Sequence, residues 1–280
     1  MNRKPSLAVQ VFQYAILVVA TIFALYPVWF VVLASGRGQR LFTLNVLGMF
    51  VPTEWSFENY RVMLFERPFL TWLKNSFFVA GFTTVFSLVV VTSAAFAISR
   101  FKFKGRGFLL LFMLALQTFP GVLSLGAVSL ILAAIGLYGS HWGLIMAYTT
   151  GTLVFSTMNL KGYFDTIPID LEEAAMIDGC GPIQSFLLVG LPLARPALAI
   201  TALFAFLGAW GEFVFASVLV PAPDSMKMAV PAMYSLANSM SVPWGYFAAG
   251  FIIIIIPTIV VFLLSQRFLE AGLTLGGVKG

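Results

Sequence analysis

The segment Glu173-Ala174-Ala175-Met176-Ile177-Asp178-Gly179, continued to Val189-Gly190-Leu191-Pro192, stands out in this chain because it begins acidic and ends on glycine and proline. Apolar runs flank it, near residues 142–160 and 197–220. Each run is long enough to cross a hydrocarbon core of roughly 30 Å. The sequence therefore predicts a short helix on an aqueous loop between two membrane spans.

Residues that start and stop helices mark both ends of this short helix. Asp170 is a candidate N-cap, and Glu173 stands where its side chain can reach back to the cap. Gly179 suits the left-handed conformation that ends a helix, and Gly181-Pro182 turns the chain. An isolated helix of about two turns is unstable in water, so we expect something to hold it. On the residues alone, a partner protein and a partner-free interfacial helix explain the segment equally well.

The composition places most of the chain in lipid. Of its 280 residues, 60% are hydrophobic and 10% are charged, and the mean hydropathy is +0.97. No soluble domain of this size hides so much apolar surface. Single Cys180 and single His141 exclude an internal disulfide and a His/Cys zinc cluster, and we expect no cofactor and no metal. The net charge is +5, and the basic residues that produce it flank apolar runs. This arrangement is typical of residues that set membrane topology and not of nucleic-acid binding.

Six apolar runs predict an all-α polytopic membrane protein. They lie near residues 11–34, 75–99, 108–133, 142–160, 197–220 and 244–265. The first run is too long for the apolar part of a signal peptide, so we expect it to be retained as a helix. No internal repeat is evident, and we expect a single transmembrane domain over residues 1–280.

Basic residues set the expected orientation of the spans. Lysine and arginine side chains crowd the connection at 100–106, between spans two and three, and this places the connection in the cytoplasm. Six spans then put both termini in the cytoplasm. The segment 35–74 is expected outside, with a short helix that Ser56 caps.

The loop resembles the EAA loop of bacterial ABC importer permeases, the cytoplasmic helix that docks onto a separate ATPase. The spacing of the family's motif is matched by the glutamate, the two alanines and the glycine between Glu173 and Gly179. Leu191-Pro192 lies where that motif ends in the family. The resemblance implies a type I importer permease fold with a cytoplasmic docking loop at about 161–196. It also implies a set of ATPase-coupling residues, namely Asp170, Leu171, Glu172, Glu173, Ala174, Ala175, Asp178 and Gly179.

The glycine-rich C-terminus carries a second resemblance. Gly272-Leu273-Thr274 and the residues that follow it are similar to the tail of the MalG-type subunit of maltose/maltodextrin transporters. In that family the tail reaches between the two ATPase subunits. The resemblance implies a cytoplasmic tail at 268–280, with four residues at the ATPase interface, namely Gly276, Gly277, Val278 and Lys279.

The two resemblances together imply an inner-membrane subunit of a binding-protein-dependent sugar importer. Its expected partners are a second, MalF-like permease, two MalK-like ATPase subunits and an extracytoplasmic sugar-binding protein. The chain contains no Gly-Lys dipeptide and hence no Walker A loop, so it is expected to be no enzyme, and ATP hydrolysis falls to the partner ATPase. Maltose or maltodextrin is the expected cargo, with trehalose or another oligosaccharide as the alternative.

Glu212 is the one ionisable residue well inside a predicted span. A charge in hydrocarbon costs at least a few kcal/mol unless it is paired or hydrated, so Glu212 is a candidate for lining the translocation pathway. Hydrogen bonding to a neighbouring helix is the other reading. A stand-alone secondary transporter, the rival from another class, needs ion-coupling residues near the midplane. It would leave the acidic loop without a role.

Overall fold

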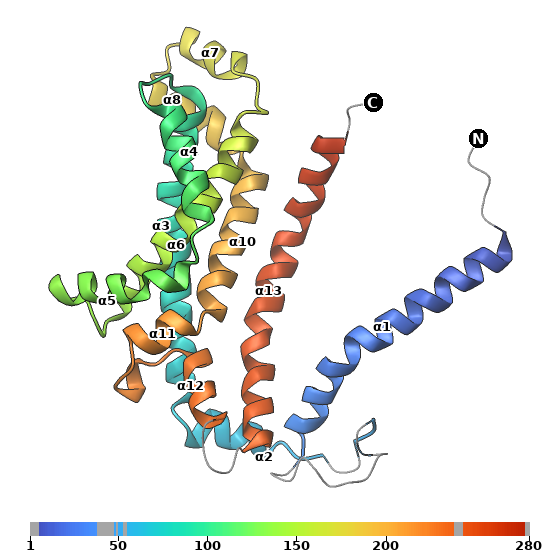
Figure 1. The fold of residues 1–280 in the computed structure, drawn as a ribbon. Helices are drawn as coiled ribbons and strands as arrows, with labels where there is room; N and C mark the ends of the chain where they lie inside the picture. Colours follow the sequence, from blue (N-terminus) through green and yellow to red (C-terminus); the bar gives the residue numbers. More distant parts are fainter. Residues whose placement is uncertain (1–5, 38–47, 49, 53–54, 238–242, 278–280) are drawn as a thin grey trace. The chain divides into compact units, whose positions relative to one another are not determined.

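The computed structural model (Figure 1) describes residues 6–37, 48, 50–52, 55–237 and 243–277, and side chains as far as Phe268. These residues form helices and connecting loops, with no strand among them, which confirms the all-α prediction. The helices in chain order are α1 (Leu7–Ser35), α2 (Glu58–Arg61), η2 (Val62–Glu66), α3 (Phe69–Arg100), α4 (Arg106–Gln117), η3 (Gly121–Ser124), α5 (Leu125–Ala134), α6 (His141–Phe164), α7 (Asp170–Ile177), α8 (Pro182–Ser185), η4 (Phe186–Gly190), α9 (Leu191–Leu193), α10 (Arg195–Gly211), α11 (Val214–Leu219), η5 (Asp224–Met226), α12 (Ala229–Ala237) and α13 (Trp244–Gly277).

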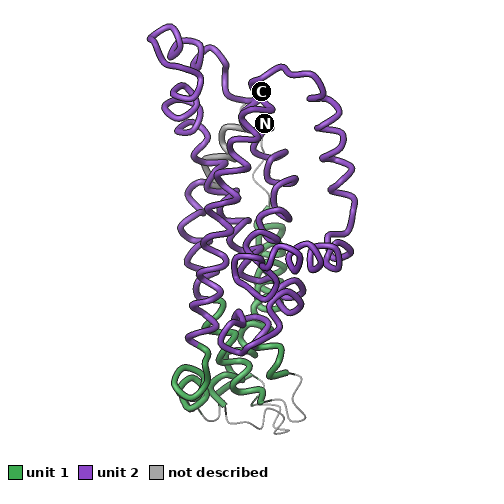
Figure 2. The backbone as a smooth tube through the Cα atoms, turned by 90° about the vertical axis from the view of Figure 1, so that its left-hand side faces the viewer, with its two compact units in different colours: residues 1–69, 233–255 green, residues 70–232, 256–280 purple. Residues whose placement is uncertain are grey.

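The chain groups into two compact units, coloured separately in Figure 2. Unit 1 contains Met1–Phe69 and Met233–Ile255, and unit 2 contains Leu70–Ala232 and Ile256–Gly280. The candidate docking segment and the helices that carry it all belong to unit 2.

In unit 1, helix α2 packs closely against the end of α1 and the start of α13. Asn59 of α2 donates a hydrogen bond to the carbonyl of Ser35 at 2.9 Å, and the Ser35 hydroxyl bonds the Tyr60 hydroxyl at 2.6 Å. A Cβ placed on Gly245 of α13 would lie 2.6 Å from the Asn59 amide nitrogen. The small residue therefore lets α13 approach α2, as is common where membrane helices pack. Ser56 was expected to cap this helix, but the N-cap position of α2 is occupied by Phe57. Ser56 lies one residue earlier and accepts a hydrogen bond from the Glu58 N–H at 3.1 Å.

Unit 2 has two buried clusters, and helices α3 and α6 contribute to both. One cluster surrounds Leu144, Ile145 and Tyr148 of α6, and the other surrounds Leu160 and Phe164 near the opposite end of the same helix. Between the clusters, the Ser87 hydroxyl of α3 and the Thr152 hydroxyl of α6 lie 2.8 Å apart and form a hydrogen bond. Such bonds between helices are typical of bundles in lipid, where apolar packing alone gives little specificity.

The predicted spans coincide with helices, but two of them are not continuous. By length and composition, α1, α3 and the part of α13 up to Phe268 can each cross a membrane, and bent helix pairs raise the number among the described residues to at most five. Helix α6, at 24 residues, is long enough for the sixth. Six spans are thus compatible with the structure.

The span expected near 108–133 is divided into two helices. Helix α4 ends at Gln117, and the segment Gly121–Ala134 leaves it at 96° (Figure 1). Pro120 is extended, with φ −63° and ψ 114°. It has no N–H to continue the helix, so the helix breaks completely before Gly121. The helix expected at 197–220 is also interrupted, at Glu212 and Phe213 between α10 and α11.

Helix α13 continues well beyond the predicted span end at 265. It is helical through Gly277, so most of the expected tail at 268–280 extends the last span. Gly276 and Gly277 close this helix, whereas Val278 and Lys279 lie outside the described residues. Contact of the tail with an ATPase stays a prediction.

Hydrogen bonds from side chains of α3 and α6 hold the loop that leads into α12. Trp72 and Asn75 of α3 donate hydrogen bonds of 2.8–2.9 Å to the carbonyls of Asp224, Ser225 and Lys227. His141 donates to the carbonyl of Met226 at 2.7 Å. This contact gives His141 a structural role, because it ties the start of α6 to the same loop.

We predict that Gly143→Ala, in the first turn of α6, destabilises the protein. A Cβ there would collide with the backbone carbonyl of Leu137, which cannot swing away as a side chain could. Such overpacking costs about 1–3 kcal/mol. The matched control is Gly162→Ala in the same helix, where a Cβ meets nothing within 4 Å. Thermal unfolding in detergent should show a lower Tm for Gly143→Ala alone, and equal Tm values would contradict the collision.

Candidate functional site

Helix α7 begins differently from the prediction. Ile169 precedes it, Asp170 is its first residue, and no side chain caps its N-terminus. The carbonyl of Ile169 accepts the N–H groups of Glu172 and Glu173 at 2.9 and 3.0 Å. The turn after Pro168 thus supplies backbone acceptors to N–H groups that a capping side chain would otherwise satisfy. The predicted Asp170 capping box is wrong, although three acids in the first turn still favour the helix dipole.

The end of α7 matches the prediction. Gly179 has φ +96°, in the left-handed region that favours glycine. This conformation lets the N–H of Cys180 reach back to the carbonyl of Ala175 at 3.0 Å. The last carbonyls of the helix are thereby satisfied, as in a glycine-terminated helix.

One face of α7 is exposed and combines acids with apolar side chains. The exposed residues are Asp170, Leu171, Glu173, Ala174, Met176, Ile177, Asp178 and Gly179, and Ala175 is half-buried. Ile177 is 87% exposed, and Ile183 in the following helix α8 is 74% exposed. Neither isoleucine belongs to the set of coupling residues that the sequence predicts. Their position in an otherwise polar loop is the sequence signal that identifies them.

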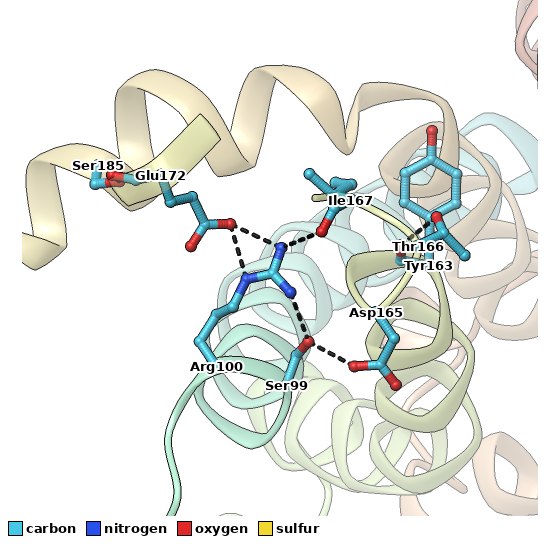
Figure 3. Close-up of polar contacts among 8 residues, drawn as sticks. All are labelled: Ser99, Arg100, Tyr163, Asp165, Thr166, Ile167, Glu172 and Ser185. Carbon is cyan, nitrogen blue, oxygen red and sulfur yellow. Dashed lines mark hydrogen bonds and ion pairs between the residues drawn. The ribbon is translucent and has the colours of Figure 1, made fainter. Parts of the chain in front are cut away.

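Glu172 is the exception, because it points inward and is buried. Its carboxylate oxygen Oε1 lies 2.8 Å from both Nε and Nη2 of Arg100, the last residue of α3 (Figure 3). The Glu172 and Arg100 side chains are 6% and 9% exposed. Glu172 was expected on the partner surface together with its neighbours, and the structure instead pairs it inside the subunit.

Arg100 is connected to the linker before α7 as well. Its Nη2 donates to the carbonyl of Ile167 at 3.1 Å, and its Nη1 donates to the Ser99 hydroxyl at 3.2 Å (Figure 3). Ser99 donates in turn to Asp165 at 2.6 Å. Sequence reasoning gave Arg100 only a role in topology, because nothing in the sequence links it to an acid 72 positions away.

The carboxyl of Asp165 is held in its charged form. Burial raises its pKa, but hydrogen bonds from Lys161 and Ser99 outweigh burial and bring the pKa below its ordinary value. These hydrogen bonds form a chain from Lys161 through Asp165 and Ser99 to Arg100. It joins the ends of α6 and α3 with the linker to α7.

Aromatic packing joins the segment after α7 to the same helices. The ring of Phe186 in η4 packs against Phe96 of α3 with ring centroids 4.5 Å apart and a tilt of 42°, and Phe96 contacts Phe164 of α6 at 5.5 Å. Gly190 is buried where a Cβ would lie 3.2 Å from the Phe96 ring. The segment after α7 thus forms the short helices η4 and α9, and Phe186 and Gly190 pack it against α3.

Glu212 lies on the wall of a partly open cavity of about 940 Å³, lined mainly by apolar residues of α4, α5, α6 and α10. Its carboxylate accepts hydrogen bonds from the Tyr148 hydroxyl at 2.6 Å and from the N–H groups of Phe215 and Ala216 at 2.9 and 3.0 Å. The carboxylate thus caps α11 and joins it to α6. The bond to Tyr148 is the contact with a neighbouring helix that one sequence reading expected. Lining of the translocation pathway, the other reading, stays a prediction.

Comparison with known proteins identifies the family. The model of the binding-protein-dependent transport system inner membrane component matches residues 89–274, a range that contains α7 and its attachments. The chain belongs to this family. The permease is an inner-membrane component of an ABC sugar importer, as the sequence predicted.

Relatives of the permease carry different sugars. It is 38% identical over 275 residues to the maltose/maltodextrin transport system permease protein MalG of Salmonella typhimurium (strain LT2), with 91% of each chain covered. It is 34% identical over 274 residues to the galactooligosaccharides transport system permease protein GanQ of Bacillus subtilis (strain 168), which covers 96% of the permease and 95% of the relative. A crystal structure of a bacterial ABC transporter that imports the acidic polysaccharide alginate matches with a TM-score of 0.78 and 23% identity, over 95% of the permease and 99% of that chain. That likeness shows a shared fold.

We predict that Gly179→Ala loosens the end of α7 and that Gly181→Ala does not. A Cβ at Gly179 meets no atom within 4 Å, so the effect comes from its positive φ alone, at a cost of about 1–2 kcal/mol. Gly181 has φ −72°, which alanine adopts freely. A glutamate-specific protease should cut after exposed Glu173 several-fold faster in Gly179→Ala, because local opening becomes more frequent. Equal cutting of both variants would show that the left-handed turn does not hold the loop.

Proposed function

We propose that the permease is the MalG-type subunit of a maltose/maltodextrin importer, and that it transmits ATPase motion to the translocation pathway. The observation that carries this proposal is 38% identity to MalG across 91% of both chains. The match to GanQ keeps a different oligosaccharide, such as trehalose or a galactooligosaccharide, as the alternative cargo.

The exposed face of α7 is the proposed docking surface for the ATPase. Its acids Asp170, Glu173 and Asp178 suit lysine or arginine side chains on a partner. Ala174 keeps the helix surface low, so that a partner backbone can approach, and Ile177 offers a large apolar anchor. A small acidic projection with an apolar end fits a cleft on a partner protein better than it fits a membrane surface.

The docking surface explains how a subunit without a nucleotide site contributes to ATP-driven transport. Closure of an ATPase pair would move this permease and a second, related permease together, and turn their shared cavity from inward-facing to outward-facing. A sugar-binding protein would deliver the cargo from outside. In this scheme the permease couples motion to transport, and the ATPase performs the chemistry.

The proposed function requires α7 to face the cytoplasm, with both termini on the same side. Half-exposed Cys180, the single cysteine of the chain, is a natural probe for this orientation. We expect a membrane-impermeant thiol reagent to label it in inside-out vesicles and not in intact spheroplasts. Labelling of Cys180 from outside would overturn the orientation.

Transport of sugars by the complete reconstituted importer tests the function itself. We expect ATP-dependent uptake of radiolabelled maltose, with competition by maltodextrins and little competition by galactooligosaccharides. Glu173→Lys should abolish uptake and weaken co-purification of the ATPase, because it reverses a charge at the centre of the docking surface. The control is Glu66→Lys, a change at a half-exposed acid outside the docking surface, whose partner Arg61 also pairs with Glu58.

Each result has a separate meaning. Preferred uptake of another sugar would change the cargo and leave the docking role intact. Normal uptake by Glu173→Lys, with the ATPase still bound, would remove the docking role.

A further inference from the structure

Two side chains form the direct polar connection between the docking helix and a membrane span. Arg100 is the last residue of α3, a helix of 32 residues that is apolar enough to cross a membrane. Glu172 lies in the first turn of α7. Each charge sits at the helix end that favours it, arginine near the C-terminus of α3 and glutamate near the N-terminus of α7.

The pair is buried, and its geometry is closely specified. Two guanidinium nitrogens of Arg100 lie 2.8 Å from the same carboxylate oxygen of Glu172, and one of them also donates to the Ile167 carbonyl at 3.1 Å. Removing two charges from water is unfavourable unless such contacts are complete. A small displacement of α7 against α3 would therefore break several contacts at once. The two helices are expected to move together.

Neighbouring acids on α7 have different tasks. Glu173 is exposed and is free to meet a partner, whereas Glu172 is 4% exposed and its backbone carbonyl also accepts a bond from Ser185 at 3.2 Å. Successive residues of a helix point about 100° apart. One acid thus faces outward and the next faces the bundle.

We propose that Arg100 and Glu172 are a positioning pair that passes displacement of the docking helix to the membrane span α3. The inference rests on the proposed docking function and adds the route by which motion enters the bundle. Apolar contacts between Phe186 and Phe96 also attach the loop to α3. Such contacts are non-directional, so they hold the loop without fixing its orientation.

Replacing both charges with apolar side chains separates positioning from simple stabilisation. Apolar residues of similar volume often restore the stability of a protein that has lost a buried ion pair. The double variant Arg100→Met/Glu172→Leu should therefore keep a Tm near that of the wild type and should still co-purify with the ATPase. The single variants Arg100→Met and Glu172→Leu, each of which leaves one buried charge unpaired, should lower the Tm.

The measured quantity is the number of sugar molecules imported per ATP hydrolysed by the complete importer in proteoliposomes. We expect the double variant to hydrolyse ATP but to import about tenfold fewer sugar molecules per ATP, within the usual range of coupling between sites. The single variant Arg100→Lys keeps a positive charge beside Glu172, so it should import more sugar molecules per ATP than the double variant and fewer than the wild type. The control double variant Arg61→Met/Glu58→Leu removes an exposed ion pair and should leave the ratio unchanged.

A wild-type ratio in the double variant would overturn the proposal, because packing alone would then transmit the motion. Loss of ATPase binding in the double variant would also overturn it, since the pair would then merely hold the docking surface in shape. If Glu173→Lys abolishes uptake while the double variant keeps a normal ratio, the docking function stands and only this inference fails.

Discussion

The buried ion pair between Arg100 and Glu172 is the constraint on which the arrangement of the loop depends. A helix of 8 residues has too little cooperative stability to persist alone in water. Here it is held by a charge pair on one side and by aromatic packing of the following segment on the other. Glu172, the Ile167 carbonyl and the Ser99 hydroxyl together accept hydrogen bonds from all three guanidinium nitrogens of Arg100. The helix is thereby fixed in orientation while its outer face remains free for a partner.

Where a helix is interrupted within an apolar segment, its backbone groups also need hydrogen-bond partners inside the protein. Lipid offers no hydrogen bonds, so a broken helix must find partners for its freed N–H groups within the protein. At the break between α10 and α11, the Glu212 carboxylate accepts two such N–H groups and the Tyr148 hydroxyl. The acidic residue that looked anomalous in the sequence therefore supplies the hydrogen-bond acceptors that the interrupted backbone needs.

Much of the architecture could be predicted from local patterns. Apolar runs located the long helices to within a few residues at most ends, since lipid imposes a minimum length on each span. Gly179 marked the end of α7 because few other residues adopt a positive φ. Prediction failed where backbone groups competed with side chains, as at Asp170. The apolar pattern also did not reveal that Pro120 divides the span near 108–133 with a bend of 96°, or that α13 continues through Gly277.

The sequence by itself determined that the chain is a helical membrane protein, where its acidic loop lies, and which family's spacing that loop follows. These properties depend on hydropathy and on residues that act within a few positions of one another. Only the tertiary structure decided which acid faces outward and which is buried, and that Arg100 pairs with Glu172. A contact between residues 72 positions apart depends on how α3, α6 and α7 pack, and no local pattern encodes that packing.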